Sequence, residues 1–170
     1  MTPRHVVTDS PIGELTIVAE GGAITALHLA GAKYRPTDAA WFGAAGDPAQ
    51  EPFAAAVRQL GEYFRRERRD FDLPLAPAGD RFAQRVWALL REIPYGGTTT
   101  YGELARRLGD RNLAQAVGRA NGHNPIAVVI PCHRVIGADG SLTGYAGGLE
   151  RKRFLLALEE PPAETAGRLF

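Results

Sequence analysis

A proline-rich segment near the middle of the sequence interrupts regular structure there. Residues 74–79 read Pro-Leu-Ala-Pro-Ala-Gly, and closely spaced prolines remove backbone donors and disfavour helix. The 170 residues are enough for one large domain or two small ones. We therefore expect an N-terminal domain over residues 1–76 and a C-terminal domain over residues 80–170, joined by a short linker.

The cysteine count and the composition exclude several classes of protein. A single cysteine, Cys132, rules out an intrachain disulfide and a zinc site made of several thiolates, so we expect no metal and no cofactor. With 45% hydrophobic residues the chain can bury a core. The longest apolar run, residues 126–132, is too short to cross a membrane, and no apolar stretch follows the first five residues. These features predict a cytoplasmic protein.

The N-terminal part predicts a small antiparallel sheet followed by a helix. Residues 14–19 and 24–29 alternate between apolar and other side chains, as half-buried strands do. Residues 31–51 have few periodic cues and predict a long surface loop. Apolar side chains then recur at helical spacing between Phe53 and Phe64, which predicts an amphipathic helix.

The C-terminal part predicts short helices with recognisable ends. Asp80 is placed to cap a helix over the following residues. Thr100 and Glu103 have the spacing of a capping box, which predicts a helix over residues 101–108. Asn112 is placed to cap a second helix that begins at Leu113. Two short helices joined by a tight turn are typical of a helix-turn-helix, although an ordinary helical hairpin gives the same pattern.

The second of these helices has mostly small side chains, and the half of the chain that contains it is basic. Gly118 in a helix interior costs about 1 kcal/mol relative to alanine, and close approach to another surface would explain it. Residues 1–80 carry 8 Lys/Arg and 11 Asp/Glu, whereas residues 81–170 carry 12 and 8. The C-terminal half is therefore the better candidate for binding a polyanion.

Cys132 and its neighbours are the best candidate for reactive chemistry. The segment Ile-Pro-Cys-His-Arg-Val follows residues 127–129, which we expect to be a strand, and precedes a glycine-rich loop. A lone cysteine is most often a small buried hydrophobe. A free thiol is only about 3% ionised at pH 7, but a nearby imidazole oriented by a carboxylate can take its proton. His133 would reach Cys132 through a water or a bend, and Glu159 and Glu160 are the candidate carboxylates.

Several motifs together resemble a known family. Pro131–Val135, Asn121–Pro125 and Gly144–Gly148, with Phe82–Trp87 and Ile93–Gly96 at matching distances, closely resemble the O6-alkylguanine-DNA alkyltransferases, also called methylated-DNA–protein-cysteine methyltransferases. The resemblance covers nearly the whole chain. It implies an α/β fold, with an N-terminal ribonuclease-H-like α/β domain and a mainly helical C-terminal domain that carries a helix-turn-helix.

The resemblance also implies an activity. The protein would repair DNA by direct reversal, moving an alkyl group from O6-alkylguanine, or from O4-alkylthymine, to Cys132. The damaged base in double-stranded DNA would first be flipped out of the helix, and the helix-turn-helix would bind the minor groove. The thioether product is stable to water, so each molecule would act once. We expect a monomer, and the sequence leaves open whether it binds DNA cooperatively.

Roles for individual residues follow from the motif match. His133 would be the base through a water, Glu159 would orient His133, and Asn124 would tie the recognition helix to the active-site loop. Tyr101 would help to rotate the nucleotide and would protonate the guanine ring. The base pocket would be lined by Pro131, Val135, Tyr145 and Ala146. The DNA-binding residues would be Tyr101, Gly102, Ala114, Gln115, Gly118, Arg119 and Ala138. The family commonly has arginine where this chain has Gln115.

Two other readings of the sequence remain open. A cysteine hydrolase also uses a cysteine nucleophile with a histidine base, but it needs an oxyanion hole and would turn over repeatedly. A non-catalytic helix-turn-helix protein would bind DNA without using Cys132 chemically.

Overall fold

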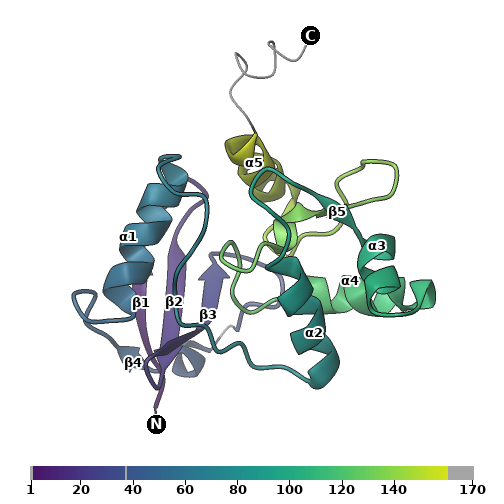
Figure 1. Ribbon diagram of the computed structural model, residues 1–170. Helices are drawn as coiled ribbons and strands as arrows, with labels where there is room; N and C mark the ends of the chain where they lie inside the picture. Colours follow the sequence, from purple (N-terminus) through teal and green to yellow (C-terminus); the bar gives the residue numbers. More distant parts are fainter. Residues whose placement is uncertain (1, 37, 161–170) are drawn as a thin grey trace.

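The computed structural model describes residues 2–36 and 38–160, and its N-terminal part is a four-stranded sheet with one helix against it (Figure 1). Strands β1 (Arg4–Thr8), β2 (Leu15–Glu20) and β3 (Ala23–Leu29) are antiparallel neighbours. The two-residue strand β4 (Ala44–Ala45) pairs in parallel with β1, which gives the order β3-β2-β1-β4. The 3-10 helix η1 (Ala39–Phe42) precedes β4, and α1 (Phe53–Phe64) follows it.

Hydrophobic spacing explains this arrangement. Leu15 to Ala19 of β2 are all buried, because β2 is an inner strand of the sheet. The side chains of α1 that recur at helical spacing, among them Leu60 and Tyr63, are buried as well. The predicted sheet and helix are confirmed. Strand β1 was not predicted, and residues 31–51, which were predicted as a loop, contain η1 and β4.

The C-terminal part is mainly helical, as predicted. Its elements are α2 (Arg81–Leu90), β5 (Thr99–Thr100), α3 (Tyr101–Arg107), η2 (Arg111–Leu113), α4 (Ala114–Gly122), η3 (Cys132–Arg134), β6 (Val135–Ile136) and α5 (Leu149–Glu159). Strands β5 and β6 form a small parallel pair. No helix within the described ranges has the length and apolar content that a membrane span requires.

Helix ends follow local hydrogen bonding, with one correction to the predictions. Asp80 caps α2 by accepting from the Ala83 amide at 2.8 Å, and Thr100 caps α3 by accepting from the Glu103 amide at 3.1 Å. The predicted cap at Asn112 is wrong. Asp110 accepts from the Asn112 amide instead and caps η2, so α4 begins at Ala114 without a side-chain cap.

The predicted strand at residues 127–129 is also wrong. Only Ile126 pairs with another strand, as a single bridge to Leu27 of β3. The chain then turns, with the Ile130 amide donating to the Ile126 carbonyl at 3.0 Å, and Val128 adopts a positive φ of 71°. A short run of buried apolar residues does not distinguish a strand from a buried turn. This turn delivers the chain to Cys132 at the start of η3.

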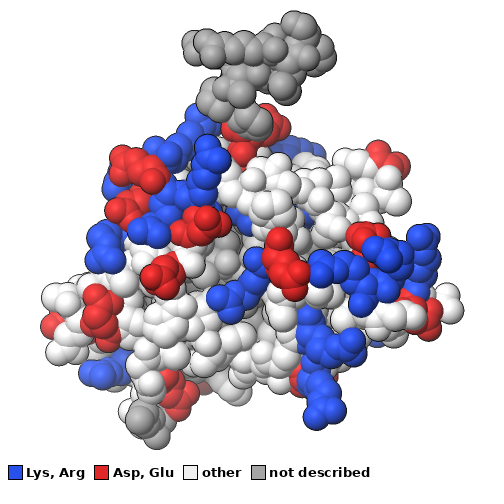
Figure 2. Space-filling model, in the orientation of Figure 1, with Lys and Arg blue, Asp and Glu red and all other residues white. Residues whose placement is uncertain are grey.

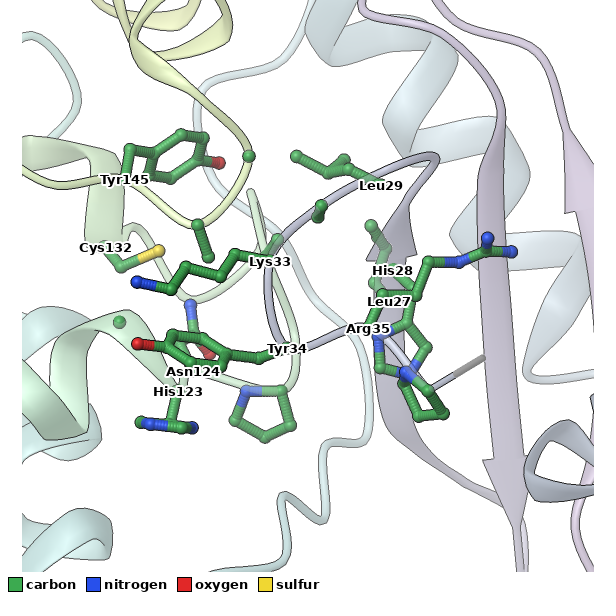
Figure 3. Close-up of a pocket in the computed structure, with 17 residues that line it drawn as sticks. Leu27, His28, Leu29, Lys33, Tyr34, Arg35, His123, Asn124, Cys132 and Tyr145 are labelled. Carbon is green, nitrogen blue, oxygen red and sulfur yellow. The ribbon is translucent and has the colours of Figure 1, made fainter. Parts of the chain in front are cut away.

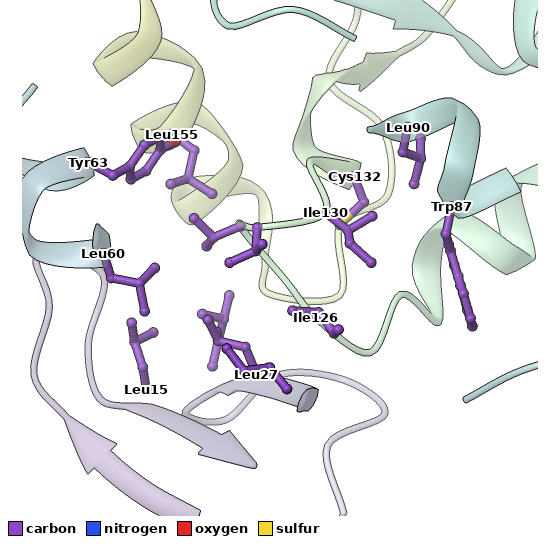
Figure 4. Close-up of a cluster of buried hydrophobic side chains, with 14 of the residues drawn as sticks. Leu15, Leu27, Leu60, Tyr63, Trp87, Leu90, Ile126, Ile130, Cys132 and Leu155 are labelled. Atoms are coloured by element: carbon purple, nitrogen blue, oxygen red, sulfur yellow. The ribbon is translucent and has the colours of Figure 1, made fainter. Parts of the chain in front are cut away.

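Strand β3 joins the two parts of the molecule. The Ile24 amide donates to the Pro74 carbonyl at 2.8 Å, so the predicted linker lies along this strand. Further along, the Leu27 amide donates to the Pro125 carbonyl at 2.9 Å. One hydrophobic cluster continues across the junction, and Figure 4 shows Leu27 facing Ile126 within it. The position of the Cys132 segment is therefore fixed by the N-terminal sheet as well as by the C-terminal helices.

Candidate active site

Cys132 lies at the inner end of a cavity between the two parts of the molecule. Cys132 is only 5% exposed. It lines a cavity of about 160 Å³ together with Asn124, Tyr145 and Ala146. Figure 3 shows the sulfur pointing into this space, with Tyr145 on one side and Asn124 on the other. A ligand that enters the cavity can therefore reach the sulfur.

The buried carboxylate of Glu159 accepts hydrogen bonds from three side chains, two of them in η3 and one in α1. His133 Nε2 donates to Oε2 of Glu159 at 2.7 Å. Arg134 donates from Nε to Oε1 at 2.8 Å and from Nη2 to Oε2 at 3.0 Å. The hydroxyl of Tyr63, on α1, donates to Oε2 at 2.6 Å. Glu160, the other candidate carboxylate, is exposed.

These contacts decide the charges in the site. Burial opposes ionisation of Glu159, but the hydrogen bonds from His133, Arg134 and Tyr63 outweigh it and lower the pKa of the carboxyl to about 2. Burial lowers the pKa of His133, although the bond to Glu159 acts in the opposite direction. His133 is therefore neutral at pH 7, with Nε2 protonated toward Glu159. Its Nδ1 is buried and has no hydrogen-bond partner among the described residues, so it can accept a proton.

The thiol is protonated in the resting site. Burial raises the pKa of Cys132 to about 11, while a hydrogen bond with Asn124 and the charge of Lys152 act to lower it. Reaction therefore needs a base that takes the proton as the new bond to sulfur forms. The neutral imidazole of His133 has an unpartnered Nδ1 among the described residues and a charged partner in Glu159, so it has the properties of such a base.

Comparisons with known proteins agree with this geometry. A family model described as "6-O-methylguanine DNA methyltransferase, ribonuclease-like domain" matches residues 4–77, and one described as "6-O-methylguanine DNA methyltransferase, DNA binding domain" matches residues 81–161. The chain belongs to the O6-methylguanine DNA methyltransferase family.

Individual relatives extend over almost the whole chain. A methylated-DNA–protein-cysteine methyltransferase of Mycolicibacterium paratuberculosis is 49% identical over 98% of both chains. The solved O6-methylguanine methyltransferase of Mycobacterium tuberculosis is 46% identical, with a TM-score of 0.83 over 96% of this chain and 98% of that one. The OGT of the same organism in complex with DNA is 48% identical, with a TM-score of 0.84 over 92% of both chains. The predicted fold, family and DNA-repair methyltransferase activity are confirmed.

The residues that the family resemblance placed around the base do not all line one cavity. Tyr145 and Ala146 line the cavity of Cys132. Val135 is fully buried, and Pro131 lines a separate cavity with Arg134. Asn124 follows the end of α4, and its side chain holds the turn that leads to Cys132, because it donates to the Ile130 carbonyl at 2.7 Å and accepts from the Ile126 amide at 3.0 Å.

The methyltransferase residues assigned to DNA lie on and around α3 and α4. Tyr101 lines a groove next to the Cys132 cavity with Gly118 and Tyr145, and its hydroxyl donates to the Thr143 carbonyl at 3.1 Å. Gln115, Arg119 and Ala138 are exposed, whereas Gly102 and Ala114 are half-buried.

The positive charge around α3 of the methyltransferase is partly neutralised by acidic side chains. Figure 2 shows basic side chains over the end of the molecule where α3 lies in Figure 1, mixed with acidic ones. Arg106 pairs with Glu103, and Arg107 pairs with Glu92 at 2.8 Å.

Several residues at the site were not predicted from the sequence. Tyr63 was identified only as part of an apolar helix face, Arg134 appeared only as a member of the Pro131–Val135 motif without a role, and no pattern pointed to Lys152. Lys33 and Tyr34, from the loop after β3, line the cavity, and Tyr34 stacks on His123 with ring centroids 3.8 Å apart. Helical spacing predicts that a side chain is buried but not which polar group it meets. The signal that could have found Arg134 is its place beside Cys132 and His133.

Proposed function

We propose that this methyltransferase removes the alkyl group from O6-alkylguanine in double-stranded DNA, and from O4-alkylthymine, in a single irreversible turnover. Cys132 is the acceptor in this proposal. The observation that carries it is the sulfur at the end of a cavity, backed by the buried His133–Glu159 pair. The product of the transfer is a thioether at Cys132. Water does not cleave its carbon–sulfur bond under ordinary conditions, so the free thiol is not regenerated.

The proton of the thiol is assigned to His133. It passes through a water to Nδ1, and the negative charge of Glu159 stabilises the imidazolium that forms. Sulfur then forms a bond to the alkyl carbon as the carbon–oxygen bond breaks. The guanine leaves as a neutral base because a ring nitrogen accepts a proton from the Tyr101 hydroxyl. That hydroxyl must turn from the Thr143 carbonyl to do so.

The base is assigned to the cavity between Tyr145 and Asn124. A stacked base cannot present its alkyl carbon in line with a buried sulfur, so the nucleotide has to leave the duplex. The Tyr145 hydroxyl is buried and has no partner among the described residues, so it is free to hydrogen-bond to the base. Entry of the base also requires Tyr34 to move or to become part of the pocket wall.

DNA binding is assigned to α4, lying in the minor groove. Gly118 supports this because an alanine there would meet only the Tyr101 ring at 3.8 Å, an ordinary contact. Internal packing therefore does not require glycine, whereas close approach of a DNA backbone would. Gln115 would fill the space of the flipped base. We further propose a monomer, organised as domains 1–76 and 80–170.

One experiment tests the function against its alternatives. The protein is incubated with a duplex that contains a single O6-methylguanine, and its intact mass is measured. We expect a stoichiometric gain of one methyl group in the wild type and none in Cys132→Ser. Binding without any gain in mass would leave only a non-catalytic role, and repeated turnover of an ester substrate would indicate a hydrolase.

A further inference from the structure

Tyr63 brings a hydrogen bond into the active site from the N-terminal part of the molecule. It lies on α1 and has no exposed surface. Figure 4 shows its ring reaching from α1 toward α5, beside Leu155. Its hydroxyl donates to Oε2 of Glu159 at 2.6 Å. Burial and the charge of Glu159 raise the pKa of Tyr63 far above its ordinary value, so the hydroxyl keeps its proton and remains a donor at neutral pH.

The two oxygens of Glu159 receive unequal numbers of hydrogen bonds. Oε2 accepts from His133 Nε2 at 2.7 Å, from the Tyr63 hydroxyl at 2.6 Å and from Arg134 Nη2 at 3.0 Å. Among the described residues, Oε1 accepts from Arg134 Nε alone, at 2.8 Å. A carboxylate oxygen offers about two lone-pair sites. The three donors to Oε2 therefore compete, and the Tyr63 hydroxyl, which makes the shortest of the three bonds, weakens the bond from His133.

This competition acts on the base of the proposed reaction. A carboxylate stabilises the imidazolium form of a neighbouring histidine, and a second donor that takes up part of the carboxylate charge reduces that stabilisation. His133 must be neutral before it can accept the thiol proton. The bond from Tyr63 to Oε2 therefore makes His133 less basic, and His133 stays neutral to a lower pH than it would without that bond.

The other titratable or charged groups near the His133–Glu159 pair come from several elements. They are Cys132 and Arg134 of η3, Lys152 of α5, Tyr95 from the segment after α2, and Tyr145 from the loop before α5. Within the described residues, Arg134 is the only one of these whose side chain hydrogen-bonds to Glu159, and its guanidinium is always charged. Tyr63 is therefore the donor to Oε2 that a substitution can remove without changing the net charge of the site.

We propose that Tyr63 is a positioning residue for alkyl transfer, which occupies Oε2 of Glu159 and so sets the pH at which His133 becomes a competent base. This inference rests on the proposed function. Tyr63 exchanges no proton during the transfer: the thiol proton passes through a water to Nδ1 of His133, while Tyr63 and Glu159 keep their own protonation states. The N-terminal part thereby acts on the chemistry of a cysteine that lies outside it.

The test compares Tyr63→Phe with Tyr95→Phe. The rings of Tyr63 and Tyr95 pack with centroids 6.3 Å apart, but the Tyr95 hydroxyl donates to the Leu158 carbonyl at 3.3 Å. Tyr95→Phe therefore removes a neighbouring hydroxyl without freeing Oε2. The rate of methyl transfer from an O6-methylguanine duplex is measured under single-turnover conditions between about pH 4.5 and pH 8, a range that spans the ordinary pKa of histidine.

We expect the acidic limb of this pH profile to move to higher pH in Tyr63→Phe, by about half a unit or more, which is about threefold in proton affinity. It should stay in place in Tyr95→Phe. Loosened packing would lower the rate equally at every pH and would not move the limb. A limb at the same pH in Tyr63→Phe and wild type would therefore overturn the proposal, even if the rate falls.

Two further measurements use no DNA. The fluorescence of the buried Trp87 over the same pH range shows whether each variant stays folded. The His133 Nε2 proton, observed by NMR at pH 7, reports on the hydrogen bond to Oε2. We expect its resonance to move downfield in Tyr63→Phe, because the bond strengthens when its competitor is removed, and to stay in place in Tyr95→Phe. An unmoved resonance in Tyr63→Phe would overturn the proposal. A downfield shift, found together with a wild type that transfers no methyl group, would support the competition at Oε2 and reject only the proposed function.

Discussion

Glu159 has a fixed charge because His133, Arg134 and Tyr63 all donate to it. Its role in the proposed reaction is to stabilise His133 once that residue has taken the thiol proton. Glu159→Gln removes the charge but keeps the shape. We expect transfer to slow by at least tenfold while lesion affinity changes little, since the carboxylate faces His133 and not DNA. Single-turnover rates and duplex binding measure the two effects. An unchanged rate would show that no charge on residue 159 is needed.

The hydrogen bond from Tyr63 to Glu159 joins the N-terminal part of the chain to this carboxylate, and removing it measures its contribution to stability. Tyr63→Phe removes one hydrogen bond to a charged group and leaves the ring in place. We expect the free energy of unfolding to fall by about 1.5–3 kcal/mol, measured by chemical denaturation. Tyr34→Phe, which removes the hydroxyl of an exposed tyrosine, is the matched control. An unchanged free energy of unfolding in Tyr63→Phe would contradict the assignment.

Stability should depend on pH in a way that follows from the same residues. The pKa of His133 is lowered on folding, so the unfolded chain binds more protons below about pH 6.5, and stability falls as pH drops through that value. The pKa of Glu159 is lowered from 4.5 to about 2, so its contribution is complete above pH 4.5 and is lost between pH 4.5 and about 2. Denaturation at several pH values should show both losses, and His133→Gln should lack the first.

The candidate reactive residues could be named from the sequence, whereas the residues that contact them could not. Cys132, His133 and Glu159 belong to a motif or lie at a recognisable helix end. Lys152 contacts a residue 9 positions away, and Tyr63 contacts one 96 positions away. No local sequence pattern contains such contacts.

At the level of single elements, α4 combines weak intrinsic stability with a smooth face. Gly118→Ala should increase the free energy of unfolding by up to about 1 kcal/mol, because alanine favours helix and its Cβ meets no atom closer than 3.8 Å. We expect the same change to weaken duplex binding, since the added methyl would narrow the groove beside Tyr101 that the proposed binding mode turns toward DNA. Opposite signs in the two measurements support minor-groove contact, and unchanged affinity would place DNA elsewhere.

Gln115 offers a second test of the same helix. We expect Gln115→Arg to bind duplex DNA more tightly and with a steeper dependence on salt, because an added cation displaces further counter-ions. The slope of log affinity against log salt for both proteins measures this. Identical slopes and affinities would reject a position for residue 115 at the DNA.

Helices with clear caps were predicted within a few residues, whereas irregular segments were not. Thr100 and Asp80 act as local signals. The turn at Val128 has no such signal: its positive φ occurs in a segment that follows a single bridge to β3, a long-range contact that no local pattern contains.

On the scale of the whole molecule, β3 makes the two parts interdependent. It binds the segment at Pro74 and the segment at Pro125, and the core continues across both parts. We therefore expect a single thermal transition in calorimetry, with the van't Hoff and calorimetric enthalpies equal. Leu27→Ala should lower the whole transition because Leu27 is buried at the junction. Two separate transitions would show that the parts fold independently.

The origin of the groups around Glu159 has a consequence for a protein that acts only once. Helix α1 supplies a donor from the first half of the chain, and α5, which carries the carboxylate, is the last helix described. A newly made or partly unfolded molecule consequently lacks the oriented imidazole that is proposed to take the thiol proton. Repair by its sulfur therefore has to wait until segments from both halves of the chain have come together.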